Sequence, residues 1–185
     1  MELKTDINRL IEKYFKEIDL NTLKPSSWRV PIGGGYYDHK EVIAVLNCYL
    51  NGELSIQKSV KNFEDNYSKY LGIKYGIAVN SGTSANILAL NTLIESGDLA
   101  KGDCVAIPAT TFISVATPII QLGLKPVYID IDPLTLNMDI TQLRNRDDIK
   151  CVMIVHTLGC PADMETLMKI SNDKGFKVIE DCCES

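Results

Sequence analysis

The residues that could carry chemistry lie in three short segments of the chain. In "KVIEDCCES", an apolar run ends in the acid Asp181, and two cysteines and Glu184 follow it. In "NSGTSAN", Gly82 stands among small hydroxyl side chains, and "PATTF" ends in the aromatic ring of Phe112. A carboxylate at the end of a buried strand is costly unless it meets a cation or hydrogen-bond donors. We therefore expect Asp181 to have a cation or hydrogen-bond donors as its partner, and the other two segments suggest the chemical class of a bound ligand.

The segment "NSGTSAN" has the composition of a phosphate-binding turn. Gly82 allows a tight turn, Ser81, Thr83 and Ser84 supply hydroxyl groups, and a helix is predicted to begin at once. The first backbone N–H groups of a helix have no partner within the helix, and they attract anions. Serine and threonine are also common helix N-caps, so simple capping is the alternative interpretation.

The three segments together suit a phosphorylated heteroaromatic cation. Pyridoxal phosphate has this chemistry, with its phosphate on the helix start, its ring against Phe112 and its protonated ring nitrogen against Asp181. Phe112 taken alone is more typical of a core or rim residue than of a ligand contact. The combination therefore carries the hypothesis, and no single residue does.

The elements that must position these residues follow an α/β pattern. Apolar runs without strict alternation alternate with helical patterns, which is typical of a parallel sheet covered on both faces. Predicted strands cover residues 75–80, 103–108, 125–132, 151–157 and 176–181, and predicted helices follow within 81–97, 111–123 and 162–175. Three further helices are predicted near residues 5–18, 39–50 and 56–71. Ligands of open α/β sheets bind beyond the carboxyl ends of the strands, where the three segments converge.

Composition excludes several classes of protein. The 185 residues are 45% hydrophobic and 23% charged with a net charge of −5, which is typical of a globular domain rather than of a nucleic-acid-binding surface. No apolar run approaches the length of a membrane span, and the charged N-terminus does not resemble a signal peptide, so we expect a cytoplasmic protein. The six cysteines include no C-x-x-C pair; we expect reduced structural thiols and no metal site.

Three blocks of the sequence resemble a known family. "LSIQKSVKNFEDNYSKYLGIKYGIAVNSGTSANILAL", "IPATTFISVATPIIQLGLKPVYIDIDPLTLNMD" and "VHTLGCPADMETLMKISNDKGFKVIEDCCES" are similar to successive blocks of the DegT/DnrJ/EryC1/StrS family. Its members are pyridoxal-phosphate-dependent enzymes of fold type I that act on nucleotide-linked keto sugars. The resemblance implies an N-terminal helical arm at residues 1–30, part of the large cofactor-binding domain at residues 31–185, and an absent C-terminal remainder.

The resemblance also implies roles for individual residues. Thr83 and Ser84 would hold the cofactor's phosphate, mostly through backbone amides, together with Gly82. Phe112 would stack on the pyridine ring and Asp181 would pair with the ring nitrogen. Glu184 stands where the family has a polar residue of varying type near the cofactor's phenolic oxygen.

The Schiff-base lysine of the family falls beyond residue 185 by the same resemblance. No lysine of the chain is expected to replace it. Lys150 and Lys177 precede the apolar parts of their strands, away from the site, and Lys61, Lys69 and Lys169 lie on polar helix faces. We therefore expect little or no transaminase activity from this chain alone.

Two reactions are compatible with the resemblance. An aminotransferase would move an amino group from a donor such as glutamate to the keto sugar; "SGT", "PATTF" and "DIDPLTLNMD" are typical of this branch, which we favour. "HTLGCP" and "EDCC" are more similar to the branch that dehydrates CDP-4-keto-6-deoxyhexoses at C3 with pyridoxamine phosphate. There a histidine replaces the lysine, and some members bind an iron–sulfur cluster.

His156, at a strand end, either faces the substrate or has a non-catalytic supporting role, and we favour the latter.

Other classes of function are less well supported. A Rossmann-type nucleotide binder would need a G-x-G-x-x-G turn after a strand, which the sequence lacks. A non-catalytic relative that binds cofactor or nucleotide stays an alternative. The resemblance further implies a homodimer with residues of both subunits in each site. The first helix and "WRVPIGGGYYD" are the segments we expect to reach the neighbouring subunit.

Overall fold

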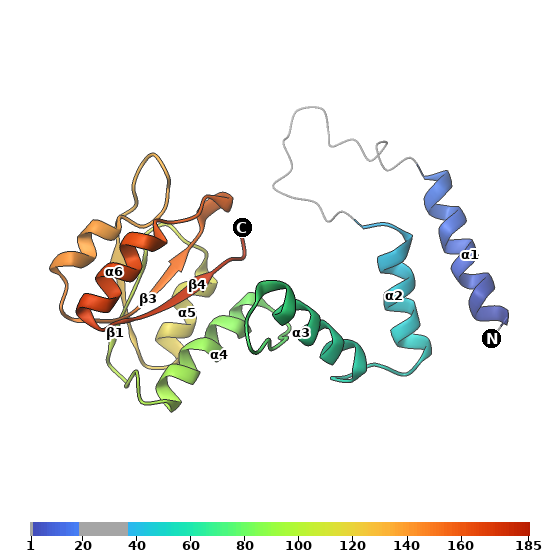
Figure 1. Ribbon diagram of the computed structural model, residues 1–185, viewed down its shortest axis with the longest axis horizontal. Coiled ribbons are helices and arrows are strands. Elements are labelled where there is room, and N and C mark those ends of the chain that lie inside the picture. The colour runs from blue at the N-terminus through green and yellow to red at the C-terminus, as the bar shows by residue number, and fades with distance from the viewer. Residues whose placement is uncertain (1, 19–36) are drawn as a thin grey trace. The chain divides into compact units, whose positions relative to one another are not determined.

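The computed structural model describes residues 2–18 and 37–185, which fall into two compact parts, Met1–Ala78 and Val79–Ser185 (Figure 1). The first part contains three helices, α1 (Glu2–Glu17), α2 (His39–Leu50) and α3 (Lys58–Leu71). Helix α2 begins at a capping box in which Asp38 and Glu41 accept each other's backbone N–H groups. Helix α3 ends at Gly72, whose φ of 69° is the left-handed conformation that favours glycine. The three helices predicted here are confirmed.

The second part contains a four-stranded parallel sheet with the strand order β2-β1-β3-β4. The strands are β1 (Cys104–Pro108), β2 (Lys125–Ile129), β3 (Ile149–Val155) and β4 (Lys177–Asp181), and the helices are α4 (Gly82–Glu95), α5 (Ile113–Gln121) and α6 (Met164–Lys174). Strand β2 lies on one side of β1, and β3 and β4 follow on the other. The direction of winding therefore reverses between β1 and β3, where ligands of open α/β sheets bind.

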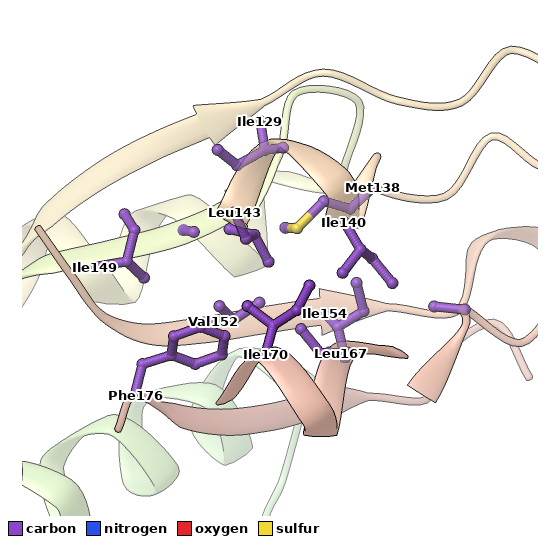
Figure 2. Close-up of a cluster of buried hydrophobic side chains, with 12 residues drawn as sticks. Ile129, Met138, Ile140, Leu143, Ile149, Val152, Ile154, Leu167, Ile170 and Phe176 are labelled. Carbon is purple, nitrogen blue, oxygen red and sulfur yellow. The ribbon is translucent and has the colours of Figure 1, made fainter. Parts of the chain in front are cut away.

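Both faces of the sheet are buried, which explains why its strands lack a polar side. Met153 and Val155 of β3 pack in a cluster with Leu90 of α4 and with residues of α5. Their neighbours Val152 and Ile154 belong to a second cluster that contains Leu167, Ile170 and Phe176 (Figure 2). Successive side chains of a strand point to opposite faces, so a strand buried on both sides must be apolar throughout. The predicted α/β fold is confirmed.

The strand predicted over residues 75–80 is wrong. These residues form no strand pairing with any other residue that the structure describes. Tyr75 and Ile77 are exposed, and the backbone N–H of Ala78 donates to a carboxylate oxygen of Glu64 at 2.9 Å. An apolar, β-branched sequence supplies the propensity for a strand, but the strand forms only when another strand takes up its backbone hydrogen bonds.

Some predictions concern residues that the structure does not describe. The domain boundary at residue 30 lies within 19–36, outside the described residues, as does "WRVPIGGGYYD" as far as residue 36. Over the described residues, none of the helices has both the length and the apolarity required to cross a bilayer. All six cysteines are free, and no group of three or more potential ligand side chains in the described ranges is arranged to hold a metal ion.

Candidate functional site

A cavity of about 400 Å³ lies at the carboxyl end of the sheet in the second part. It is bordered by the start of α4, the segment before α5, the end of β3 and the residues after β4. The lining residues are Ser81, Gly82, Thr83, Thr111, Phe112, Ser114, Val115, Val155, Asp181, Cys183 and Glu184. The three segments that the sequence analysis singles out therefore meet in one cavity.

The start of α4 offers unpaired backbone N–H groups to this cavity. Ser81 is the N-cap, and its hydroxyl oxygen accepts the N–H of Ser84 at 3.2 Å. Helix geometry leaves the N–H groups of Gly82 and Thr83 without an intrahelical carbonyl, and both residues line the cavity. Ser84, which the sequence analysis expects at the phosphate, is not a lining residue, and its hydroxyl donates to Asn80 at 2.7 Å. The backbone N–H groups that lack a helical acceptor at the cavity are thus those of Gly82 and Thr83.

Gly82 lies close to the segment after β4. A Cβ atom at position 82 would lie 3.0 Å from the Sγ atom of Cys183, a tighter contact than a carbon atom normally accepts. Without that Cβ atom, Cys183 can pack against the helix start.

Asp181 is a buried carboxylate, 6% exposed, whose two oxygens are both hydrogen-bonded. Oδ2 accepts from the side-chain amide of Asn86 at 2.9 Å, and Oδ1 accepts from the backbone N–H of Cys183 at 3.0 Å. Burial raises the pKa of Asp181 and is the largest single influence. The hydrogen bonds from Asn86 and Cys183 together outweigh it, so the pKa lies below its ordinary value. The cavity therefore contains an ionised acid.

Phe112 and Thr111 line the cavity just before α5. Phe112 is 70% exposed, and its ring is a large apolar surface without a packing partner sufficient to bury it. Thr111 has a buried hydroxyl oxygen that makes no hydrogen bond to any described residue. A buried polar atom without a partner is unusual in a folded protein, and here it borders a cavity. Both features are those of a wall that a ligand completes.

Glu184 lines the cavity while its carboxylate is held by the turn after β3. Its Oε2 atom accepts the backbone N–H of Leu158 at 2.7 Å, and Leu158 has a positive φ of 53°. The amide of Asn137 supports the same turn, donating to the carbonyl of Cys160 and accepting the N–H of Thr157, each at 2.9 Å. Glu184 is therefore fixed at the rim of the cavity.

His156 lies beneath this turn and is not among the lining residues. It is 6% exposed; Nδ1 accepts the backbone N–H of Ala162 at 3.1 Å, and Nε2 lies 3.1 Å from a carboxylate oxygen of Glu180. Because Nδ1 is an acceptor, the proton of the neutral ring is on Nε2, which donates to Glu180. This arrangement suits the supporting role favoured from the sequence rather than contact with a ligand.

Sequence reasoning overlooked Asn86, Thr111 and Cys183 as residues of the site. Asn86 had a readable signal, because it is a polar residue directly before the apolar run Ile87–Leu90 of its helix. Cys183 was interpreted as a packing thiol, and the spacing of residues does not show that its sulfur meets Gly82. Its pKa is raised to about 11, first by the hydrogen bond to Asp181 and then by burial, so the thiol is protonated at neutral pH.

The model of the DegT/DnrJ/EryC1/StrS aminotransferase family matches residues 36–185. The chain belongs to this family. The match covers the whole of the second part and therefore every residue that lines the cavity.

Curated relatives have names that include both reactions considered above. The chain is 32% identical over 159 residues to a GDP-4-keto-6-deoxy-D-mannose 3-dehydratase of Yersinia pseudotuberculosis, covering 84% of this chain and 40% of the relative. It is 30% identical over 144 residues to a dTDP-3-amino-3,4,6-trideoxy-alpha-D-glucose transaminase of Micromonospora megalomicea, covering 77% and 37%. The chain thus spans about two fifths of the length of the curated relatives that it matches.

Solved structures show the same architecture. The E. coli GDP-4-keto-6-deoxy-D-mannose-3-dehydratase with bound hydrated pyridoxal phosphate superimposes with a TM-score of 0.78 at 31% identity, over 85% of this chain and 41% of that one. The predicted fold, part of the large domain of a fold-type-I enzyme, is confirmed by this likeness.

Proposed function

We propose that the chain binds pyridoxal or pyridoxamine 5′-phosphate and forms part of an enzyme that modifies a nucleotide-linked keto sugar. The observation that carries the proposal is the cavity in which the ionised Asp181 faces the anion-binding start of α4. Membership of the family and the names of the relatives support the class of cofactor and substrate.

The lining residues fit this cofactor in three respects. The N–H groups of Gly82 and Thr83 are free to bind a phosphate. The exposed ring of Phe112 offers a stacking surface for a flat heteroaromatic ring. The unpaired hydroxyl of Thr111 is a polar group that a bound ligand would satisfy.

The chain's own residues would set the cofactor's charge and position. When bound, the cofactor supplies a protonated pyridine ring that accepts an electron pair from the substrate. Asp181 would hold the proton on the ring nitrogen, because an ionised carboxylate at that atom favours the charged form of the ring. Phe112 would cover the face of the ring, and Glu184, fixed by Leu158, would lie at the rim of the cavity.

Amino transfer is our first proposal for the reaction, with a donor such as glutamate, and 3-dehydration is the second. The second has a specific observation in its favour: the match to the Yersinia 3-dehydratase covers more of the chain than the match to the transaminase, 84% against 77%. The residue that forms or replaces the Schiff base is decisive. Of the described residues that line the cavity, none is a lysine or a histidine.

A binding titration tests the cofactor proposal. Pyridoxamine 5′-phosphate is added to the chain, and its fluorescence is followed. We expect saturable binding that inorganic phosphate competes away. Asp181→Ala should weaken it by roughly 10- to 100-fold, the effect of losing a hydrogen bond to a charged group. Asp173→Ala, at an exposed position on α6, is the matched control and should bind as the unmodified chain does. Absence of binding, or equal binding by the Asp181 and Asp173 variants, would contradict the proposal.

A product assay tests the reaction. The chain is incubated with the cofactor, glutamate and a nucleotide-linked 4-keto-6-deoxy sugar, and the sugar is analysed by mass spectrometry. An amino sugar indicates transamination, and loss of the C3 hydroxyl group indicates dehydration. Because no lysine lines the cavity, we expect this chain by itself to give little of either. Turnover at about 1 s⁻¹ or faster, a common rate for enzymes, would overturn that expectation.

A further inference from the structure

Asn86 is a buried polar side chain. It lies on α4, one turn beyond the anion-binding start of the helix, and is 6% exposed. Four residues further along the same helix, Leu90 is fully buried in the apolar cluster under the sheet. A buried amide is costly unless its hydrogen-bonding groups find partners. The position therefore requires an explanation beyond packing.

Both hydrogens of the Asn86 amide are donated to groups at the cavity. One goes to Oδ2 of Asp181 at 2.9 Å and the other to the carbonyl oxygen of Ser114 at 3.2 Å. Because both partners are acceptors, the nitrogen of the amide must be the atom that faces them. A single side chain thus ties α4 to the first turn of α5 and to the end of β4.

The carbonyl of Ser114 is available to Asn86 because of Pro118. In an α-helix, the carbonyl of residue 114 would accept the N–H of residue 118, but proline has no N–H to donate. Pro118 is buried inside α5 and leaves this carbonyl without its helical donor. Asn86 supplies the donor that the helix lacks, which links a proline and an asparagine 32 positions apart in the printed sequence.

The second bond of Asn86 fixes the acid. Asp181 is held at Oδ2 by Asn86 and at Oδ1 by the backbone of Cys183, so its carboxylate plane cannot rotate without breaking a bond. The other titratable groups that act on it are His156 and the thiol of Cys183. Two donors aimed at one carboxylate favour its ionised form. The direction and the charge of the acid are therefore set before any ligand binds.

We propose that Asn86 is a positioning residue that keeps the Asp181 carboxylate ionised and aimed into the cavity. It also holds that carboxylate at a fixed distance from the anion-binding turn and from the segment of Phe112. In relation to a cofactor this inference rests on the proposed function, but its effect on Asp181 is a property of the chain without any ligand.

The first test measures the titration of Asp181 in the ligand-free chain. The ¹³C resonance of the Asp181 carboxyl carbon is followed against pH in the unmodified chain and in Asn86→Asp. A second carboxylate in place of the amide repels Asp181, so we expect the apparent pKa of Asp181 to rise by at least about one unit. Asn172→Asp is the matched control, because Asn172 is an exposed asparagine on α6, and it should leave the titration unchanged. An unaltered titration in Asn86→Asp would overturn the proposal.

A second variant serves if Asn86→Asp does not fold. Asn86→Ser removes both donated hydrogens at a smaller volume and introduces no charge. The pKa of Asp181 should again rise, because burial is then opposed only by Cys183 and His156. A folded Asn86→Ser chain with the Asp181 titration of the unmodified chain would contradict a positioning role, since a merely structural residue would change stability alone.

The last test separates this inference from the proposed function. Binding of pyridoxamine 5′-phosphate to Asn86→Ser should be about 5- to 20-fold weaker than to the unmodified chain, and Asn172→Ser should bind normally. If the unmodified chain binds no cofactor but Asn86→Ser shifts the Asp181 titration, the proposed function fails and the inference stands. If the unmodified chain binds and Asn86→Ser alters neither titration nor affinity, the inference fails and the proposed function stands.

Discussion

The two ends of the parallel sheet differ in the exposure of their charged and polar side chains. At the amino end, ion pairs lie in water: Lys177 contacts Asp98 at 3.1 Å, and Arg146 contacts Asp148 at 2.7 Å, with each side chain at least one third exposed. At the carboxyl end, Asn86, His156 and Asp181 are each 6% exposed: Asn86 donates a hydrogen bond to Asp181, and His156 contacts the carboxylate of Glu180 and accepts the backbone N–H of Ala162.

The difference separates what stabilises the fold from what prepares a site. Exposed ion pairs contribute roughly 0–1 kcal/mol to the free energy of unfolding, and they remove little charge from water. Their presence therefore does not indicate a functional site. Buried polar groups are costly to leave unpaired and offer no advantage over apolar packing for stability alone. The end of the sheet that buries them also borders the cavity, and the ionised Asp181 lines it.

Removing the imidazole at the carboxyl end should have the largest effect on stability. His156→Ala leaves the buried N–H of Ala162 without its acceptor, so we expect a loss of about 1–3 kcal/mol in the free energy of unfolding. Lys177→Ala at the amino end should cost at most about 1 kcal/mol. Urea unfolding followed by circular dichroism gives both values, and equal losses at the two ends would abolish the distinction.

The reactivity of the cysteines should distinguish the cavity from the exposed surface. The pKa of Cys183 is raised to about 11, chiefly by its hydrogen bond to Asp181, and the thiolate is the reactive form. Cys160 and Cys183 are both exposed, yet at pH 8 we expect iodoacetamide to modify Cys183 at least about tenfold more slowly than Cys160, as measured by mass spectrometry. Asp181→Asn should accelerate the reaction at Cys183. Equal rates at the two cysteines in the unmodified chain would argue against the bond to Asp181.

The contact between Gly82 and Cys183 predicts that a second substitution restores the cofactor affinity that the first one lowers. Gly82→Ala places a Cβ atom 3.0 Å from the sulfur, so the Cys183 side chain must give by a few tenths of an ångström, and we expect cofactor affinity to fall about three- to tenfold. Removing the sulfur in the double variant Gly82→Ala/Cys183→Ala should restore most of that affinity. Titrations of the unmodified chain, the two single variants and the double variant with pyridoxamine 5′-phosphate measure the interaction between the two residues. Additive effects would show that the two residues do not interact.

The smallest expected effect is at the amino end of the sheet and depends on pH. Arg146 lowers the pKa of Asp148 to about 2, so this carboxyl group stabilises the folded chain above its unfolded pKa of roughly 4. That contribution is lost as the pH falls toward 2. Because both side chains are more than one third exposed, Arg146→Ala should cost less than about 1 kcal/mol at pH 7 and nothing near pH 2. A penalty that persists at pH 2 would contradict this.

The sequence predicts the sheet and the residues of the site better than the bonds between them. Apolar runs such as "CVMIV" predict strands correctly because both faces of the sheet are buried. Asp181, Gly82 and Phe112 could be predicted to lie at one edge of the sheet because they stand at strand and helix ends, and all three line the cavity. The strand predicted over residues 75–80 is wrong, because a strand forms only beside a partner strand, and local propensity does not reveal whether that partner exists. The bond from Asn86 to Asp181 joins residues 95 positions apart, and only folding brings them together.

The most direct test observes the proton that Asp181 would hold. Pyridoxamine 5′-phosphate carrying ¹⁵N in its ring is bound to the chain, and its ¹⁵N resonance is recorded at a pH where the free ring is mostly unprotonated. We predict a pyridinium shift in the unmodified chain and a neutral pyridine shift in Asp181→Asn. A neutral ring in the unmodified chain, or a pyridinium in both, would contradict it.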